Sequence, residues 1–190
     1  MGTRGEAVRA HLTSFFAGHS VAERRWLLGP MVHEHPSFYV LEVAPGPRSS
    51  LWVYVSVGAS DLRQNEGAAL EFILACPSQS DRGVELVTMS ARYHRTHGLD
   101  RGHTLPIGEP WLPGATCDHL LISLPYPWGP DFEVLRSVRS HIHILWLLPI
   151  TTAERGYKAE HGQEALEVLL EKAGLEYWRV DRCSVTSQAR

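Results

Sequence analysis

HIHILWLLPITTAE, the stretch from His141 to Glu154, decides the fold of this chain. Residues 141–148 are almost continuously apolar, which is typical of a strand buried on both faces of a sheet. Pro149 and Ile150 end that strand. Thr151 and Glu154 then match a capping box, in which a hydroxyl and a carboxylate each accept a backbone N–H at the start of a helix. The stretch predicts a central strand that leads directly into a helix.

Helical spacing appears in three other segments, where apolar side chains recur on one face. These are residues 4–17, with Val8, Leu12, Phe15 and Phe16; residues 81–97, with Val84, Val87 and Ala91, closed by Gly98; and residues 163–173, with Leu166, Leu169, Leu170 and Ala173, closed by Gly174. Each predicts an amphipathic helix that packs on a sheet.

Strand-like segments lie between these helices. They are residues 37–43, 51–57, 70–75 and 118–124, and the tail 177–185 is expected to be a closing edge strand. Residues 98–117 are rich in Gly and Pro, which predicts a surface loop with at most one short strand. The order of elements differs from strict βαβ alternation. We expect one α/β (α+β) domain over residues 1–190, with a mixed, largely antiparallel central sheet flanked by helices.

Composition excludes several classes of function. Eighteen basic and 21 acidic residues give a formal net charge of -3, so nucleic acid is not an expected partner. Cys76, Cys117 and Cys183 are far apart and form no CxxC pair, which argues against a disulfide framework or a thiolate zinc site. The N-terminus has no apolar signal core, and the longest apolar run, 142–150, is too short to span a bilayer. We expect a cytoplasmic protein without a membrane partner.

The 11 histidines are the best candidates for a metal site. His33 and His35 alternate, as do His141 and His143, and each pair would share one face of a strand. A metal, if one is bound, would be held by His94 and His97 at helical spacing together with His103. The zincin pattern HExxH is absent. We therefore expect no cofactor, and a metal-dependent hydrolase stays as an alternative.

A serine hydrolase is the other catalytic alternative. Ser60 lies in the turn Gly58–Leu62 after a strand, but a nucleophile elbow would need glycine where Leu62 stands. Asp118 and His119 are adjacent, so on a strand they would point to opposite faces, which argues against a dyad. The scattered acids Glu34, Glu42, Glu71 and Glu109 are expected to be solvated surface residues.

A third alternative is a structural or self-associating module. Trp111 and Trp128 lie in Gly- and Pro-rich segments. If both side chains were exposed, they would form an apolar patch suited to self-association.

Several segments, read in order, resemble the Suppressor of fused (SUFU-like) domain family. They are Trp52–Ser60, Glu71-Phe72, Ala91-Arg92-Tyr93, Gly102–Gly108, His119–Ile122, Ile144–Glu154, His161-Gly162-Gln163 and Asp181-Arg182. Together they span about residues 25–185, with the helix at about 4–17 in front of that core.

The resemblance implies a fold similar to the N-terminal domain of Suppressor of fused, without catalytic activity. Eukaryotic members hold a transcription-factor peptide as an added β-strand. The chain is most similar to the short single-domain bacterial type, which implies an immunity protein that neutralises a partner toxin. The expected function is therefore that of a non-catalytic protein-binding module, whose oligomeric state the sequence leaves open.

The same resemblance implies a partner-binding site at Tyr93, Asp100, His103 and His119. Tyr93 matches a family tyrosine that takes part in peptide capture. The family's acidic residue falls on Gly102 here, and Asp100 is nearby but out of register. His103 and His119 also match family positions, and we expect them to hold the 98–117 segment in place.

Overall fold

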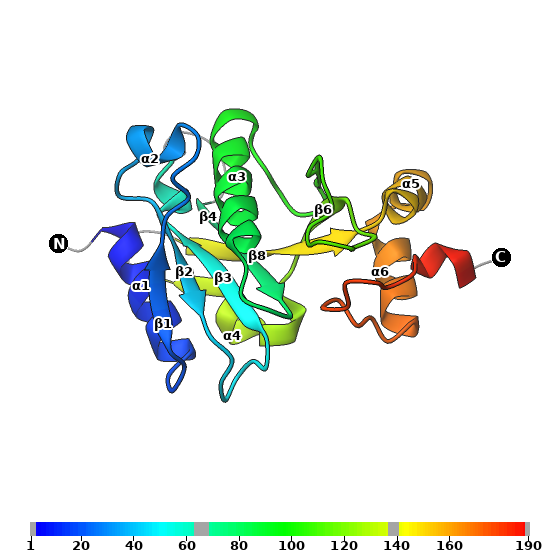
Figure 1. Ribbon diagram of the computed structural model, residues 1–190, viewed down its shortest axis with the longest axis horizontal. Coiled ribbons are helices and arrows are strands. Elements are labelled where there is room, and N and C mark those ends of the chain that lie inside the picture. Colours follow the sequence, from blue (N-terminus) through cyan, green and yellow to red (C-terminus); the bar gives the residue numbers. More distant parts are fainter. Residues whose placement is uncertain (1–2, 63–68, 137–140, 189–190) are drawn as a thin grey trace.

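One mixed sheet runs through the computed structural model, which describes residues 3–62, 69–136 and 141–188 (Figure 1). Its strand order is β1-β2-β3-β4-β8-β6-β5, and β7 also pairs with β8. Their bounds are β1 Val21–Arg24, β2 Tyr39–Val43, β3 Trp52–Val57, β4 Ala69–Cys76, β5 Thr104–Pro106, β6 His119–Ser123, β7 Val134–Arg136 and β8 His141–Ile150. Only the β4–β8 pair is parallel among the described strands, which confirms the expected mixed, largely antiparallel sheet.

The central strand is β8, as predicted. Residues 142–146 pair with β4 on one side, while β7 and β6 share the other side. The strand continues two residues beyond the predicted end and leads into helix α5 (Thr152–His161). The capping box is present: the Glu154 N–H donates to the Thr151 hydroxyl oxygen at 3.2 Å, and the Thr151 N–H donates to the Glu154 carboxylate at 2.9 Å.

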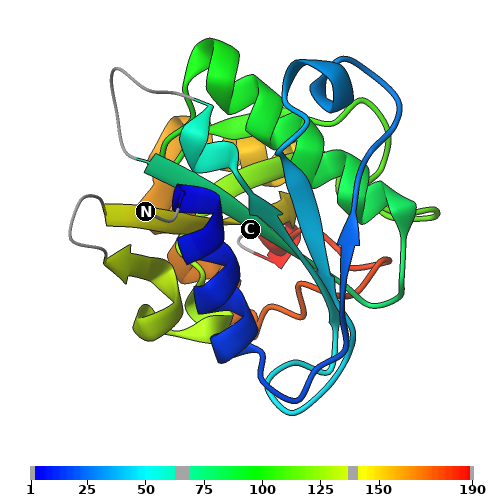
Figure 2. The same cartoon turned by 90° about the vertical axis from the view of Figure 1, so that its left-hand side faces the viewer.

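Helices cover both faces of the sheet (Figures 1 and 2). Helix α3 (Asp81–His97) packs its predicted stripe on one face, against side chains such as Tyr54 and Leu147. Helices α1 (Arg4–Phe15) and α6 (Gln163–Lys172) pack on the other face, against side chains such as Trp146 and Leu148. Successive residues of β8 point alternately into the two cores. Each fully buried apolar side chain contributes about 1.5–3 kcal/mol through the hydrophobic effect.

Besides the 3₁₀-helices, four short elements of the described chain were not predicted. They are β1, β7, the short helix α2 (Met31–Glu34) and the short helix α4 (Pro130–Glu133). His33 lies in α2, so the predicted strand face shared by His33 and His35 is wrong. His141 and His143 do lie on one strand, β8.

The tail prediction is also wrong. Residues 177–184 form turns and irregular structure rather than an edge strand, and a 3₁₀-helix, η3 (Val185–Gln188), follows. Arg182 points inward instead of alternating with its neighbours, and forms a bidentate ion pair with Glu154 at 2.6 and 2.7 Å. This buried pair attaches the tail to the start of α5.

The 98–117 segment is a surface loop with one short strand, β5, as expected, but several of its apolar side chains point into the core. Leu105, Ile107, Leu112 and Cys117 are buried, and Trp111 is 0% exposed. Trp128, in the 3₁₀-helix η2 (Tyr126–Trp128), is buried as well. The apolar patch expected at the two tryptophans is therefore absent.

Within the described residues, every helix is too short or too polar to cross a membrane.

Candidate functional site

The three histidines proposed as metal ligands each make a different contact. The buried His94 Nδ1 accepts the Leu99 N–H at 2.9 Å and so closes the end of α3. His97 is exposed and stacks on Tyr93, with ring centroids 4.4 Å apart. His103 Nδ1 accepts the Asp100 N–H at 3.2 Å. In the described part of the chain, no three His, Cys, Asp or Glu side chains are grouped to hold a metal ion.

Ser60 is a structural residue. Its side chain is buried, and its hydroxyl donates to the Glu71 carboxylate at 2.8 Å. Glu71 is fully buried too and accepts four further donors: the Ser56 hydroxyl and the N–H groups of Gly58, Ala59 and Ser60. Burial raises the pKa of Glu71 to about 7, against the opposing effect of these hydrogen bonds. The carboxylate holds the β3–η1 turn together, so the expectation of a solvated Glu71 is wrong.

Asp118 and His119 are in contact, contrary to the strand argument. His119 Nδ1 lies 2.9 Å from Asp118 Oδ1. The contact forms because β6 begins at His119, so the alternation of a strand does not apply to Asp118. The other Asp118 oxygen accepts the Thr152 hydroxyl at 2.6 Å. The pair therefore connects β6 to the first turn of α5.

The four predicted partner-binding residues form three separate groups. Tyr93 is 40% exposed and stacks on His97. Asp100 and His103 bond each other in the turn before β5, whose outer edge has no partner strand among the described residues. His119 bonds Asp118. Each of these histidines thus stabilises its own segment, and a binding role for the four residues stays a prediction.

Gly102, where the resemblance implies an acidic residue, has a backbone conformation that disfavours any side chain. Its φ of 88° is in the left-handed region, where residues other than glycine are strained. A side chain there would also meet the Gln163 amide oxygen of α6. The Gly102 N–H donates to the Ile122 carbonyl oxygen at 2.8 Å, which fixes this backbone beside β6.

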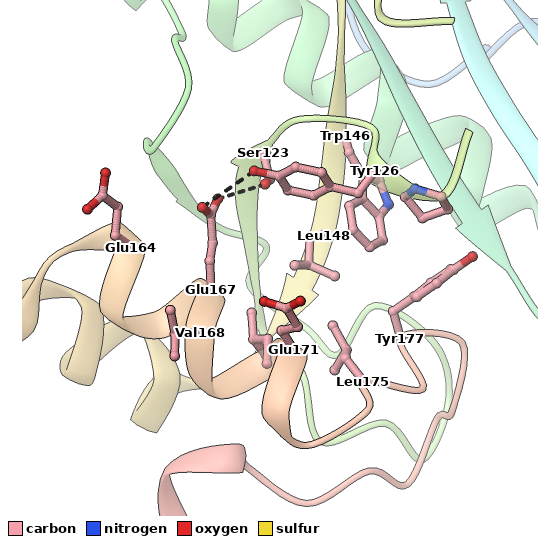
Figure 3. A pocket seen from close by; sticks show the side chains of 12 residues that line it. Ser123, Tyr126, Trp146, Leu148, Glu164, Glu167, Val168, Glu171, Leu175 and Tyr177 are labelled. Atoms are coloured by element: carbon pink, nitrogen blue, oxygen red, sulfur yellow. Dashed lines mark hydrogen bonds between the residues drawn. The ribbon is translucent and has the colours of Figure 1, made fainter. Parts of the chain in front are cut away.

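An open groove of about 640 Å³ lies between α6, η2, β8 and the residues after α6 (Figure 3). Its lining is largely apolar: Pro127, Trp146, Leu148, Val168, Leu170, Leu175 and Tyr177. Polar side chains stand around it: Ser123, Tyr126, Glu164, Glu167 and Glu171. Sequence analysis did not find this site, because its residues come from four separate segments.

The acidic side of the groove belongs to α6. Glu164, Glu167 and Glu171 follow helical spacing, so they lie on one face. Glu167 accepts hydrogen bonds from the Ser123 hydroxyl at 3.1 Å and the Gln163 amide at 2.6 Å, and it pairs with Arg101 at 3.3 Å. Glu164 and Glu171 are exposed and form no ion pair with the described residues. Desolvation, followed by the nearby Glu167 charge, raises the pKa of Tyr126 above its usual value.

Three of the seven exposed large apolar side chains of the described residues lie at or beside the groove. Tyr126 is 56% exposed and Val168 44% exposed, and both line the groove. Trp178, 37% exposed, lies at an adjoining hollow that shares Pro127 and Tyr177 with the groove. Large apolar side chains gathered at one exposed concave site are typical of a binding surface.

The sheet order and the helices on both faces define an α/β domain of a known architecture. The chain belongs to the Suppressor of fused family, because the family model described as Suppressor of fused protein (SUFU) matches residues 34–183. A SUFU homolog from Neisseria gonorrhoeae FA 1090 has a TM-score of 0.84 and 33% identity, with 96% of each chain covered. The predicted family and fold class are thus confirmed.

Three other proteins are similar to this chain at lower identity. The protein "Immunity protein YqcF" of Bacillus subtilis (strain 168) is 23% identical over 164 residues, which cover 80% of this chain and 84% of that protein. A chain of the Sufu–Fu complex shares the fold with a TM-score of 0.69 at 13% identity, over 97% of this chain and 93% of that one. Drosophila Suppressor of fused matches over 96% of this chain but only 51% of its own length, with a TM-score of 0.63 and 11% identity.

Proposed function

We propose that this protein is a non-catalytic protein-binding module that acts as an immunity protein and neutralises a partner toxin by binding it. The observation that carries the proposal is the groove of about 640 Å³ at α6, which has a largely apolar lining and the exposed side chains of Tyr126 and Val168. The similarity to a protein named as an immunity protein supports a toxin as the partner.

Two of the candidate catalytic residues, Ser60 and His94, have hydrogen bonds that hold the fold together. Ser60 donates its hydroxyl to a buried carboxylate, and His94 closes α3. His119 and Asp118 bond one another at the start of α5. A stoichiometric binder needs none of these groups to be free, whereas an enzyme needs at least one nucleophile or base that can reach a substrate.

Co-expression tests the proposal. A toxin domain encoded beside this chain is produced in a host with and without the protein, and cell survival and complex formation are measured. We expect survival only with the protein and a complex of fixed stoichiometry. Loss of toxicity without any complex, together with chemical modification of the toxin, would instead indicate an enzyme.

A further inference from the structure

We propose that the groove binds a basic segment of the partner, with arginine or lysine side chains paired with Glu164 and Glu171 and a neighbouring apolar side chain on the groove floor. This inference rests on the proposed function, because it names the chemistry of the partner that the module binds.

The charges of α6 favour a cationic partner. Three carboxylates on one helical face repel one another. Glu167 is balanced, because it pairs with Arg101 and accepts bonds from Ser123 and Gln163. Glu164 and Glu171 remain uncompensated in the described part of the chain. Cations paired with them would relieve the repulsion, whereas an anionic partner would increase it.

The second step concerns the groove floor. The rings of Trp146 and Tyr177 meet edge to face with centroids 4.8 Å apart, and Leu148 and Leu175 lie beside them (Figure 3). Aromatic faces attract cations and also bury the methylene stem of arginine or lysine. The floor therefore suits a long side chain that is apolar along its length and cationic at its end, as well as apolar neighbours.

The third step concerns an unused hydrogen-bond donor. Trp146 is 4% exposed, and its indole N–H has no hydrogen-bond partner among the described residues. A buried donor of this kind is rare in a finished core. Because this nitrogen is itself buried, an acceptor on an inserted segment would reach it only if the Trp146 side chain moved.

The size and the charge of the groove favour a protein loop over a nucleic acid as the partner. A volume of about 640 Å³ suits one or two protruding side chains rather than a flat surface. The acidic rim disfavours phosphate groups, and therefore nucleic acids. A protruding basic and apolar loop of a protein fits both conditions.

The test uses the whole protein and two sets of synthetic peptides. One set has arginine flanked by leucine or phenylalanine, and in the other set glutamate replaces the arginine. Binding to the wild-type protein is measured by fluorescence anisotropy at low and high salt. We expect the arginine peptides to bind at least about tenfold more tightly than the glutamate peptides, with an advantage that falls as salt rises.

A pair of double variants locates the binding. Glu164→Gln with Glu171→Gln should weaken the arginine peptides about tenfold. The control, Glu109→Gln with Glu160→Gln, makes the same change of net charge at exposed acids outside the groove and should alter binding by less than about twofold. The indole N–H resonance of Trp146, assigned with Trp146→Phe, should shift when peptide is added.

The outcomes separate this inference from the proposed function. Equal weakening in both double variants, tighter binding of a DNA duplex than of any peptide, or no peptide binding would overturn the basic-segment inference. If the groove variant still neutralises the toxin as well as wild type, the inference fails and the immunity function stands. If the wild-type protein neutralises no toxin but binds the arginine peptides in the groove, the immunity function fails and the groove chemistry stands.

Discussion

Acidic residues serve two opposite purposes in this molecule. Glu71 and Glu154 are buried, and each accepts several hydrogen bonds from side-chain and backbone donors. Glu164 and Glu171 stand exposed at a groove without an ion-pair partner in the described residues. A carboxylate saturated with internal donors stabilises the fold, whereas one left unsaturated beside exposed apolar surface is available to a partner. Replacing members of each group tests this distinction.

The largest effect is expected at the Glu154–Arg182 pair. Glu154 also accepts the N–H groups of Thr151 and Val185, at 2.9 and 3.0 Å. Burial alone would raise the pKa of Glu154, but the Arg182 guanidinium outweighs it and holds that pKa below its usual range. Arg182→Ala leaves a buried uncompensated carboxylate and should lower the free energy of unfolding by about 3–5 kcal/mol.

Urea unfolding of Arg182→Ala and of Glu154→Gln with Arg182→Met provides the measurement and its control. The double variant should recover part of the loss, because it leaves no unpaired charge. A loss below about 1 kcal/mol in Arg182→Ala would show that the pair is solvated and does not fix the tail.

Glu71 should have the next largest effect. Glu71→Ala removes the acceptor of two hydroxyls and three N–H groups in the β3–η1 turn, and leaves buried donors unsatisfied. We expect the free energy of unfolding to fall by about 3 kcal/mol. Thermal and urea unfolding measure it, and Glu109→Ala is the matched control at an exposed acid. Equal stability of the two variants would contradict the structural role of Glu71.

The pH dependence of Glu71 sharpens this comparison. Its pKa rises from 4.5 to about 7 on burial, so between these values the folded state binds more protons than the unfolded state. The stabilising contribution is therefore complete below about pH 4.5 and is lost as the pH rises through about 7.

Glu71→Gln lacks this titration, so the stability difference between wild type and variant should shrink across that window in the direction of rising pH. Unfolding at several pH values, analysed as the difference between the two proteins, cancels the other titrating groups. A difference that stays constant would mean that the hydrogen bonds hold the pKa of Glu71 near 4.5.

Local sequence patterns predicted those parts of the fold that local chemistry determines. Helix α3 was placed at residues 81–97 because an apolar stripe and Gly98 mark it, and the capping box placed the start of α5. The 177–185 tail failed for a physical reason. Val180 packs against one core and Tyr177 and Val185 pack against the other, while Arg182 is buried in an ion pair that strand-like composition does not reveal.

The groove could not be predicted from the sequence for a similar reason. Ser123, Trp146, Glu167 and Tyr177 come from different segments, and only the folded sheet brings them together. The one local trace was the set of acids Glu164, Glu167 and Glu171 on α6, beside the buried Leu166 and Leu170. A solvated helix face shows the same pattern, so the groove was needed to give those charges a meaning.

The smallest effect on stability is expected at the groove itself. Glu164→Gln with Glu171→Gln removes two charges that repel Glu167 along α6, so the free energy of unfolding should stay within about 0.5 kcal/mol of wild type or rise slightly. Urea unfolding at low salt measures it, with Glu109→Gln and Glu160→Gln as the control. A clear loss of stability would mean that Glu164 and Glu171 support the fold as Glu71 and Glu154 do. Unchanged stability, combined with weakened binding of basic peptides, would show that Glu164 and Glu171 bind the partner, in contrast to Glu71 and Glu154, which stabilise the fold.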